Sequence, residues 1–277
     1  MRKVLNIAHA GARSLAPENT LAAARKSIEA GADMWEFDVS VSKDGVLILF
    51  HDDHLLRTTD AREKFPDRSP WIVTTFSLEE IKCLDAGSWF VEADPFSEIA
   101  AGRVPRKDLE SYRGERIPTL EEALVFTKEH GFKANVELKA VPPPMDRFPI
   151  VRTALELIDQ LDVKDHVVVS SFQHHWLREV EREWPEIEVQ ALVGWPPDKP
   201  IDWSDYHFKT YNVPEWLSPE EVKYLIKRGL KVNVYVVNDE ETMKQYIKLG
   251  VAGIITDFPQ RLRAILDAAE GQWGKKT

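Results

Sequence analysis

Short apolar runs rich in β-branched residues recur along this chain, and amphipathic stretches separate most of them. Such a run predicts a buried strand, and apolar residues that repeat every three or four positions predict a helix. The expected strands cover residues 4–9, 34–39, 133–138, 166–171, 188–193, 207–211, 232–237 and 253–256, and the expected helices cover 19–30, 119–130, 148–161, 174–182, 218–228 and 239–249. Eight strands alternating with helices are typical of the α/β class and of a closed parallel TIM (β/α)8 barrel. A doubly wound open sheet is the alternative, because alternation alone does not show closure.

One extra strand interrupts this alternation after the second expected strand. An Asp-Gly pair at 44–45 lies between the apolar runs 39–41 and 46–50, and such a pair between two runs indicates a β-hairpin. The return limb of the hairpin would bring His51 and Asp52 back to the mouth of the barrel.

The segment that follows the hairpin has a different composition. Residues 53–117 are rich in charge, proline and aromatic residues and do not follow the rhythm of strands and helices. Connections longer than about 12–15 residues are uncommon unless they have a function or a structure of their own. We therefore expect one catalytic domain over residues 1–277, with an insertion at 53–117 that caps the catalytic face.

The charge of the chain narrows the range of its partners. Its 277 residues carry a formal net charge of −10, which argues against broad binding to nucleic acid or to anionic membranes. An acidic protein can still act on an anionic substrate when a cation is bound in its site. The one cysteine, Cys83, excludes an internal disulfide. The apolar run at 4–8 is too short for a signal peptide or a membrane span, so we expect a cytoplasmic protein without stable membrane insertion.

Chemically active side chains gather at the ends of the expected strands, where barrels of this kind build their active sites. In chain order they are His9, Glu36, Asp38, His51, Glu137 and Lys139. Positions 36 and 38, like positions 137 and 139, are two residues apart, which puts both members of each pair on the inward face of a strand. Three carboxylates and a lysine inside an apolar barrel are costly unless a partner offsets their charge. A divalent cation does so, and oxygen ligands suit Mg²⁺, Ca²⁺ or Mn²⁺.

Buried salt bridges between these carboxylates and Lys139 or nearby arginines are the structural alternative. The two histidines at separate strand ends, His9 and His51, favour a catalytic site instead. Two histidines near a cation can divide the work, because one can take a proton from the attacking group while the other protonates the leaving alkoxide.

Ten short blocks of sequence extend this pattern over nearly the whole chain. They are residues 7–12 (IAHAGA), 16–21 (APENTL), 36–39 (EFDV), 43–45 (KDG), 51–52 (HD), 114–122 (GERIPTLEE), 135–139 (NVELK), 170–172 (SSF), 232–238 (VNVYVVN) and 253–259 (GIITDFP). In composition and order these blocks resemble those of the glycerophosphodiester phosphodiesterase family.

The resemblance implies both an activity and a set of site residues. The implied ligands of one divalent cation are Glu36, Asp38 and Glu137, the implied acid/base pair is His9 and His51, and the implied phosphate contact is Lys139. The segment at 53–117 corresponds to the insertion of the family, which covers the active site and helps to select the substrate. The implied substrate is a small glycerophosphodiester, and the implied products are sn-glycerol 3-phosphate and an alcohol such as choline or ethanolamine.

The chain departs from the family pattern at one important position. The family usually has His-Arg-Gly, in which the arginine helps to hold the phosphate, where this chain has His9, Ala10 and Gly11. Alanine cannot make this charge-assisted contact, so we predict that Arg13, on the same loop, replaces it. Tyr235 stands where a tryptophan is common and would keep an aromatic wall in the substrate site.

Other functions stay open on sequence grounds. They are a related phosphodiesterase that acts on lysophospholipid or another diester, an inactive barrel that binds phosphodiesters, and a metal-dependent lyase or aldolase barrel. The last is disfavoured because Lys139 follows a carboxylate and does not lie in an apolar pocket. Asn19 or Thr20, and also Asn238, are expected only to cap helices. The sequence sets neither the oligomeric state nor the preferred head group.

Overall fold

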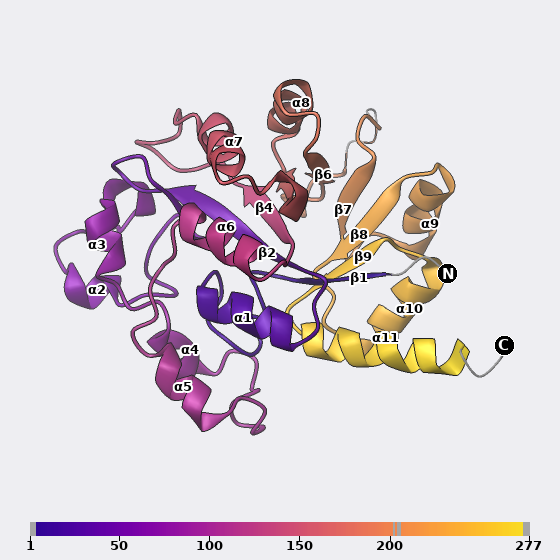
Figure 1. Cartoon of the computed structure of the whole chain (residues 1–277), viewed down its shortest axis with the longest axis horizontal. Helices are drawn as coiled ribbons and strands as arrows, with labels where there is room; N and C mark the ends of the chain where they lie inside the picture. Colours follow the sequence, from indigo (N-terminus) through magenta and orange to yellow (C-terminus); the bar gives the residue numbers. More distant parts are fainter. Residues whose placement is uncertain (1–3, 202, 204–205, 274–277) are drawn as a thin grey trace.

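Eight parallel strands close into a barrel in the computed structural model, which describes residues 4–201, 203 and 206–273. Their order around the barrel is β1 (Leu5–Ala8), β9 (Gly253–Thr256), β8 (Lys231–Tyr235), β7 (Thr210–Pro214), β6 (Glu188–Leu192), β5 (Val167–Ser171), β4 (Ala134–Leu138) and β2 (Met34–Val41). β1 pairs with β9 on one side and with β2 on the other, and the second pairing closes the sheet. The predicted TIM barrel is therefore confirmed, and the open doubly wound sheet is excluded (Figure 1).

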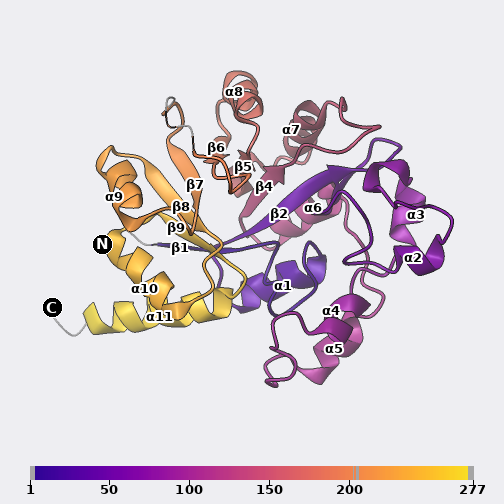
Figure 2. The same ribbon diagram turned by 180° about the vertical axis from the view of Figure 1, so that it is seen from behind.

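Helices cover the outside of the barrel (Figure 2). They are α1 (Leu21–Glu29), α6 (Leu120–Glu129), α7 (Ile150–Gln160), α8 (His174–Glu183), α9 (Pro219–Lys227), α10 (Glu240–Leu249) and α11 (Pro259–Trp273). In α7, for example, Leu155 and Ile158 are buried on the face that is turned to the barrel. Such faces pack with the outward side chains of the strands, including Trp35 and Phe37, to form the main core. No helix among the described residues is long and apolar enough to cross a membrane.

The predicted hairpin is present at the end of β2. β3 (Leu47–Leu49) pairs with β2 in antiparallel orientation, and Val39 lies opposite Leu49. The N–H of Phe50 then donates to the carbonyl of Asp38 at 3.0 Å. This pairing brings the following residue, His51, back beside Asp38 of β2.

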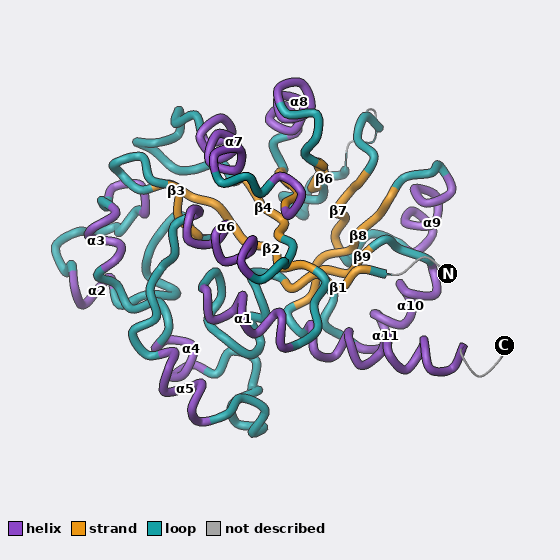
Figure 3. Tube along the Cα trace, in the orientation of Figure 1, coloured by secondary structure: helices purple, strands orange, loops and turns teal. Residues whose placement is uncertain are grey.

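Residues 53–117, all of which are described, contribute helices but no barrel strand. The helices are α2 (Ala61–Lys64), α3 (Leu78–Lys82), α4 (Ser88–Ala93) and α5 (Arg106–Tyr112), with a 3-10 turn, η1 (Val73–Thr75), before α3. Figures 1 and 3 show them gathered on one side of the barrel, beside α1 and β2. One apolar cluster joins Phe76 to Phe50 of the hairpin limb, and a second joins Phe90 to Ala23 of α1. The exact bounds of an insertion and its capping role stay predictions.

Two elements differ from the sequence-based expectation. β7 begins at Thr210 and not at residue 207, because Phe208 is buried as a loop side chain that packs edge-on against Tyr211. Aromatic residues have a high strand propensity, which explains the error. α11 was not expected, although Pro259 suits the first position of a helix. The ends of the expected domain, residues 1–3 and 274–277, lie outside the described residues.

Candidate active site

The carboxyl ends of the strands surround a cavity of about 830 Å³. Seven residues predicted for the site line this cavity: His9, Glu36, Asp38, His51, Glu137, Lys139 and Tyr235. Arg13 is not among the described residues that line it. The structure thus brings together side chains from β1, β2, the hairpin limb, β4 and β8.

Three carboxylates converge at one place in the cavity. Glu36, Asp38 and Glu137 each have an oxygen within 4.8 Å of the others. The alternation of side chains along β2 turns Glu36 and Asp38 inward, and the pairing of β2 with β4 puts Asp38 beside Glu137. Lys139 follows the end of β4, and its Nζ lies 3.2 Å from Asp38 Oδ1 and 3.9 Å from Glu137 Oε1.

The loop after β1 holds two of these carboxylates in place. The N–H of Ala10 donates to Glu36 Oε2 at 2.8 Å, while Glu36 Oε1 is buried with no hydrogen-bond partner among the described residues. Asn19 makes two hydrogen bonds with Asp38, since its Nδ2 donates to Asp38 Oδ2 at 2.9 Å and its Oδ1 accepts from the Asp38 N–H at 3.0 Å. Gly11 allows the loop to lie this close to α1, since its φ is +79° and a Cβ there would come within 2.6 Å of the helix.

Crowding changes the ionisation of these carboxylates. Burial, followed by the charges of Asp38 and Glu137, raises the pKa of Glu36 well above its usual value. Burial and the charge of Asp38 raise the pKa of Glu137 to about 7. Burial also opposes ionisation of Asp38, but the positive charges of Lys139 and His51 outweigh it and lower the pKa of Asp38. A divalent cation would offset the same repulsion, and the unpartnered oxygen of Glu36 fits such an ion.

His9 and His51 are each paired with an aspartate through Nδ1. His9 Nδ1 lies 2.7 Å from Asp257 Oδ1, and His51 Nδ1 lies 2.6 Å from Asp52 Oδ1. The hydrogen bond to Asp52, followed by the charge of Asp38, raises the pKa of His51. An aspartate at Nδ1 fixes the orientation of the ring and leaves Nε2 as the nitrogen that can serve a substrate.

Arg13 and Tyr235, both predicted to contact the substrate, are placed differently. Arg13 Nη2 lies 2.8 Å from Glu18 Oε2, and its guanidinium lies over the ring of Phe96. Its phosphate contact stays a prediction, because in this structure Nη2 is engaged by Glu18 and Arg13 is not among the described residues that line the cavity. Tyr235 presents its ring to the cavity, while its hydroxyl donates to the carbonyl of Val193 at 2.6 Å.

The sequence analysis missed several residues that support the site. Helix capping falls to Thr20 and Asp239, so neither Asn19 nor Asn238 has the capping role that was considered for it. Asn238 Nδ2 instead donates to Asp257 Oδ2 at 2.7 Å. The signal that could have identified the two aspartates is their position, because Asp52 follows His51 and Asp257 follows β9.

A closed parallel barrel whose carboxylate, lysine and imidazole side chains meet at the carboxyl ends of its strands defines a TIM-barrel enzyme. The sequence pattern of the glycerophosphoryl diester phosphodiesterase family matches residues 9–261. The chain belongs to this family. It is therefore a phosphoric diester hydrolase of the glycerophosphodiester phosphodiesterase type.

Relatives match the chain over almost its full length. A glycerophosphodiester phosphodiesterase from Caldanaerobacter subterraneus subsp. tengcongensis is 34% identical over 267 residues, which cover 94% of this chain and 96% of the relative. One from Bacillus subtilis is 31% identical over 270 residues, which cover 93% of this chain and 84% of the relative. Among solved structures, an Oleispira antarctica phosphodiesterase in complex with the product sn-glycerol-3-phosphate is 27% identical with a TM-score of 0.76, and the match covers 96% of this chain and 97% of the other.

Proposed function

We propose that this enzyme hydrolyses glycerophosphodiesters to sn-glycerol 3-phosphate and a free alcohol, with one divalent cation bound by Glu36, Asp38 and Glu137. The observation that carries the proposal is the convergence of three carboxylates in the cavity that both histidines line, one of them with a buried oxygen that has no hydrogen-bond partner in the described part of the chain. The Oleispira antarctica relative supports the identity of the product, because its structure holds sn-glycerol-3-phosphate.

The cation and Lys139 would bind the phosphate. A bound Mg²⁺, Ca²⁺ or Mn²⁺ would neutralise the charge that develops on the phosphate oxygens. Lys139 would donate from Nζ to one of these oxygens, and its position beside Asp38 at the cavity wall supports this role. Tyr235 would contact the organic part of the substrate, together with Phe172, whose ring packs edge-on against it.

His9 and His51 would share the proton transfers through Nε2. One ring accepts the proton of the attacking hydroxyl as the oxygen of that hydroxyl bonds to phosphorus. The other ring donates a proton to the alcohol oxygen as its bond to phosphorus breaks. The attacking hydroxyl belongs either to water or to the 2-position of the glycerol. In the second case a cyclic phosphate forms first, and water then opens it.

Hydrolysis assays test the proposal directly. Purified enzyme is incubated with glycerophosphocholine or glycerophosphoethanolamine, with and without added Mg²⁺ or Ca²⁺, and sn-glycerol 3-phosphate is measured. We expect product only when a divalent cation is present. If neither diester is cleaved with Mg²⁺, with Ca²⁺ or, in a further assay, with Mn²⁺, the proposed activity is wrong.

The apolar part of the cavity favours a second candidate, a phosphodiesterase that acts on lysophospholipid. Phe172, Leu192 and Trp195 line the cavity, and Trp195 is 73% exposed at its rim. Such a wall could receive an acyl chain, which glycerophosphocholine lacks. Competition between lysophosphatidylcholine and glycerophosphocholine separates the two candidates, because the preferred substrate has the higher kcat/KM.

The proposed substrates also suggest a metabolic role for the enzyme. Glycerophosphodiesters are deacylated phospholipids, so we propose a role in lipid metabolism, with the cytoplasm as the expected location. Fractionation of cells that produce the protein would test the location.

A further inference from the structure

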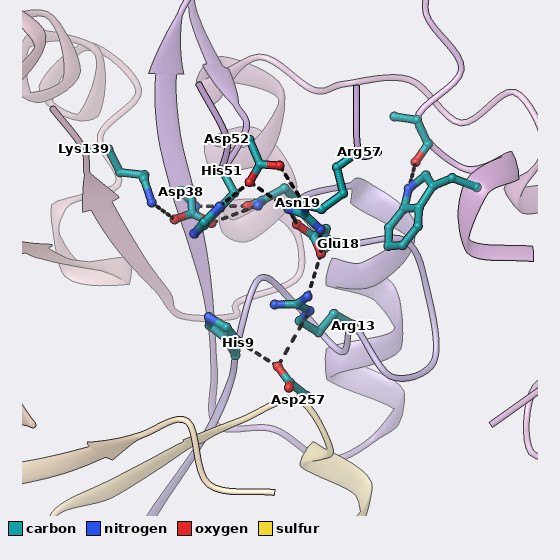
Figure 4. Close-up of polar contacts among 12 residues, drawn as sticks. His9, Arg13, Glu18, Asn19, Asp38, His51, Asp52, Arg57, Lys139 and Asp257 are labelled. Carbon is teal, nitrogen blue, oxygen red and sulfur yellow. Dashed lines mark hydrogen bonds and ion pairs between the residues drawn. The ribbon is translucent and has the colours of Figure 1, made fainter. Parts of the chain in front are cut away.

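The two histidine–aspartate pairs of the active site come from distant parts of the chain. Asp257, the partner of His9, follows β9, whereas Asp52, the partner of His51, follows the hairpin. Figure 4 shows that the pairs lie on two sides of one buried carboxylate, that of Glu18. The Glu18 side chain is only 4% exposed.

Two arginines connect Glu18 to these aspartates. On one side Arg13 Nη2 lies 2.8 Å from Glu18 Oε2, and Arg13 Nε lies 3.7 Å from Asp257 Oδ1. On the other side Arg57 donates to both oxygens of Glu18, at 3.0 and 2.6 Å, and to both oxygens of Asp52, at 2.7 and 3.0 Å. A series of ion pairs therefore runs from one histidine to the other, and its longest link is the 3.7 Å contact of Arg13 with Asp257, which is not a hydrogen bond.

We propose that Glu18 is a positioning residue shared by both candidate acid/base histidines. It acts on His9 through Arg13 and Asp257, and on His51 through Arg57 and Asp52. The kinetic part of the test below rests on the proposed function, whereas the positions of the two rings do not. It assigns Arg13 to the support of His9, and so gives that arginine a role that needs no contact with the phosphate.

The physical basis is that a buried carboxylate is stable only beside groups that offset its charge. The buried Glu18 carboxylate forms an ion pair with each guanidinium group, so it helps to fix where the two arginines lie. The guanidinium group of Arg57 is planar, so it can donate to two carboxylates only in one orientation. The position of Glu18 thereby also fixes the position of Asp52. Each aspartate then sets the tautomer and the plane of its histidine. Without Glu18, the orientations of the His9 and His51 rings would both be less fixed.

The chain supplies a matched control for a test of Glu18. Glu98 is also a buried glutamate, 1% exposed, and it also lies between two arginines, Arg103 at 2.6 Å and Arg261 at 2.9 Å. Glu98 is not among the described residues that line the cavity. Glu18→Gln and Glu98→Gln therefore remove the same charge from similar surroundings, but only the first breaks the connection between the histidines.

The decisive measurement is the position of the histidine ring signals by NMR, recorded without substrate. We expect Glu18→Gln to move the ring signals of both His9 and His51, although Glu18 touches neither ring. Glu98→Gln should leave the His51 signals unchanged and move those of His9 less, because its partner Arg261 lies over the ring of Phe258, next to Asp257. For glycerophosphocholine we expect Glu18→Gln to lower kcat by about 10- to 100-fold, the usual cost of losing an orienting partner, with a smaller change in KM. Ring signals that stay at their wild-type positions, or that move equally in the Glu98 variant, overturn the proposal.

Two further variants keep the test valid if Glu18→Gln does not fold. Lysine keeps the charge of arginine but lacks the planar guanidinium group, which donates hydrogen bonds in several fixed directions. We therefore expect Arg57→Lys to move only the His51 signals and Arg13→Lys to move only those of His9. If both lysine variants leave both rings unchanged, the proposal is wrong. Failure of the proposed function is a separate outcome, because it would appear as absent turnover in the wild-type enzyme while the ring signals still report on Glu18.

Discussion

The two oxygens of Glu36 have different surroundings, since one accepts a hydrogen bond from Ala10 and the other is buried without a partner among the described residues. We expect EDTA to abolish turnover and Glu36→Gln to lose most of it, because the carboxylates would then lack their cation or one of its ligands. Added Mg²⁺ or Ca²⁺ should raise the Tm of the wild-type enzyme, since an ion that binds only the folded state stabilises it. The Glu36 variant should not respond. Full activity after exhaustive chelation would contradict the metal assignment.

The two histidines allow a prediction that separates acid from base. His9→Ala and His51→Ala should each lower kcat on glycerophosphocholine by about 10²–10⁴-fold, the range for general acid–base groups. A nitrophenyl leaving group needs no proton, so the variant that lacks the acid should recover on a nitrophenyl diester while the other should not. Steady-state kinetics on both substrates provide the measurement. Wild-type kcat in either alanine variant means that the histidine concerned has been misassigned.

Arg13 has two candidate roles, and its kinetics distinguish them. If it contacts the phosphate, Arg13→Ala should lower kcat/KM by about 30-fold or more, the cost of losing a buried charged partner. Ala10→Arg combined with Arg13→Ser should then recover much of this loss. If Arg13 orients His9 through Asp257, the loss should fall mainly on kcat, and the added arginine should not restore it. A kinetically silent Arg13→Ala excludes both roles.

For single residues, a contact in the site can be predicted from the sequence when the two residues are close together along the chain. The inward position of Glu36 and Asp38 comes from the two-residue repeat of a strand, which is visible in the sequence. The pairing of His9 with Asp257 spans 248 residues and exists only because the barrel closes. The position of Asp257 after β9 marks it as a candidate site residue, but no local pattern pairs it with His9, whereas Asp52 is the direct neighbour of His51 in the sequence.

Among the elements, the hairpin and the segment after it contribute most to the particular shape of this site. The hairpin limb carries His51, and the start of the segment contributes Asp53, His54 and Arg57 to the cavity wall. An Asp-Gly turn identifies the hairpin in the sequence, whereas the short helices of 53–117 lack a repeating pattern long enough to predict.

Replacement of residues 60–110 by a short linker tests the insertion. We expect the shortened protein to keep its barrel, since these residues supply no barrel strand, but to have a lower Tm, because Phe50 and Ala23 would lose apolar neighbours. Its preference between glycerophosphocholine and lysophosphatidylcholine should change. Circular dichroism and kcat/KM for both substrates provide the measurements. A chain that no longer folds shows that the segment belongs to the core.

For the whole molecule, the strand–helix alternation predicts an α/β fold with parallel strands, and the pairing of β1 with β2 shows the closure that alternation alone leaves open. The registers of the strands and the start of β7 cannot be predicted from the sequence, because buried aromatic residues such as Phe208 look alike in a strand and in a packed loop. The residues that bind and react are predictable as a group because they follow strand ends, which all face the same side of a closed parallel sheet.

Closure of the barrel also has a consequence during synthesis on the ribosome. β1 leaves the exit tunnel early, but it must wait for β9 to close the sheet, and His9 must wait for Asp257, which follows 248 residues later. At ordinary rates of translation this delay is on the order of 10–50 s. A nascent chain therefore has no oriented His9 until Asp257 has emerged. A chain that stops before β9 has its first catalytic residue but not the partner that orients it, so it is not yet an active hydrolase.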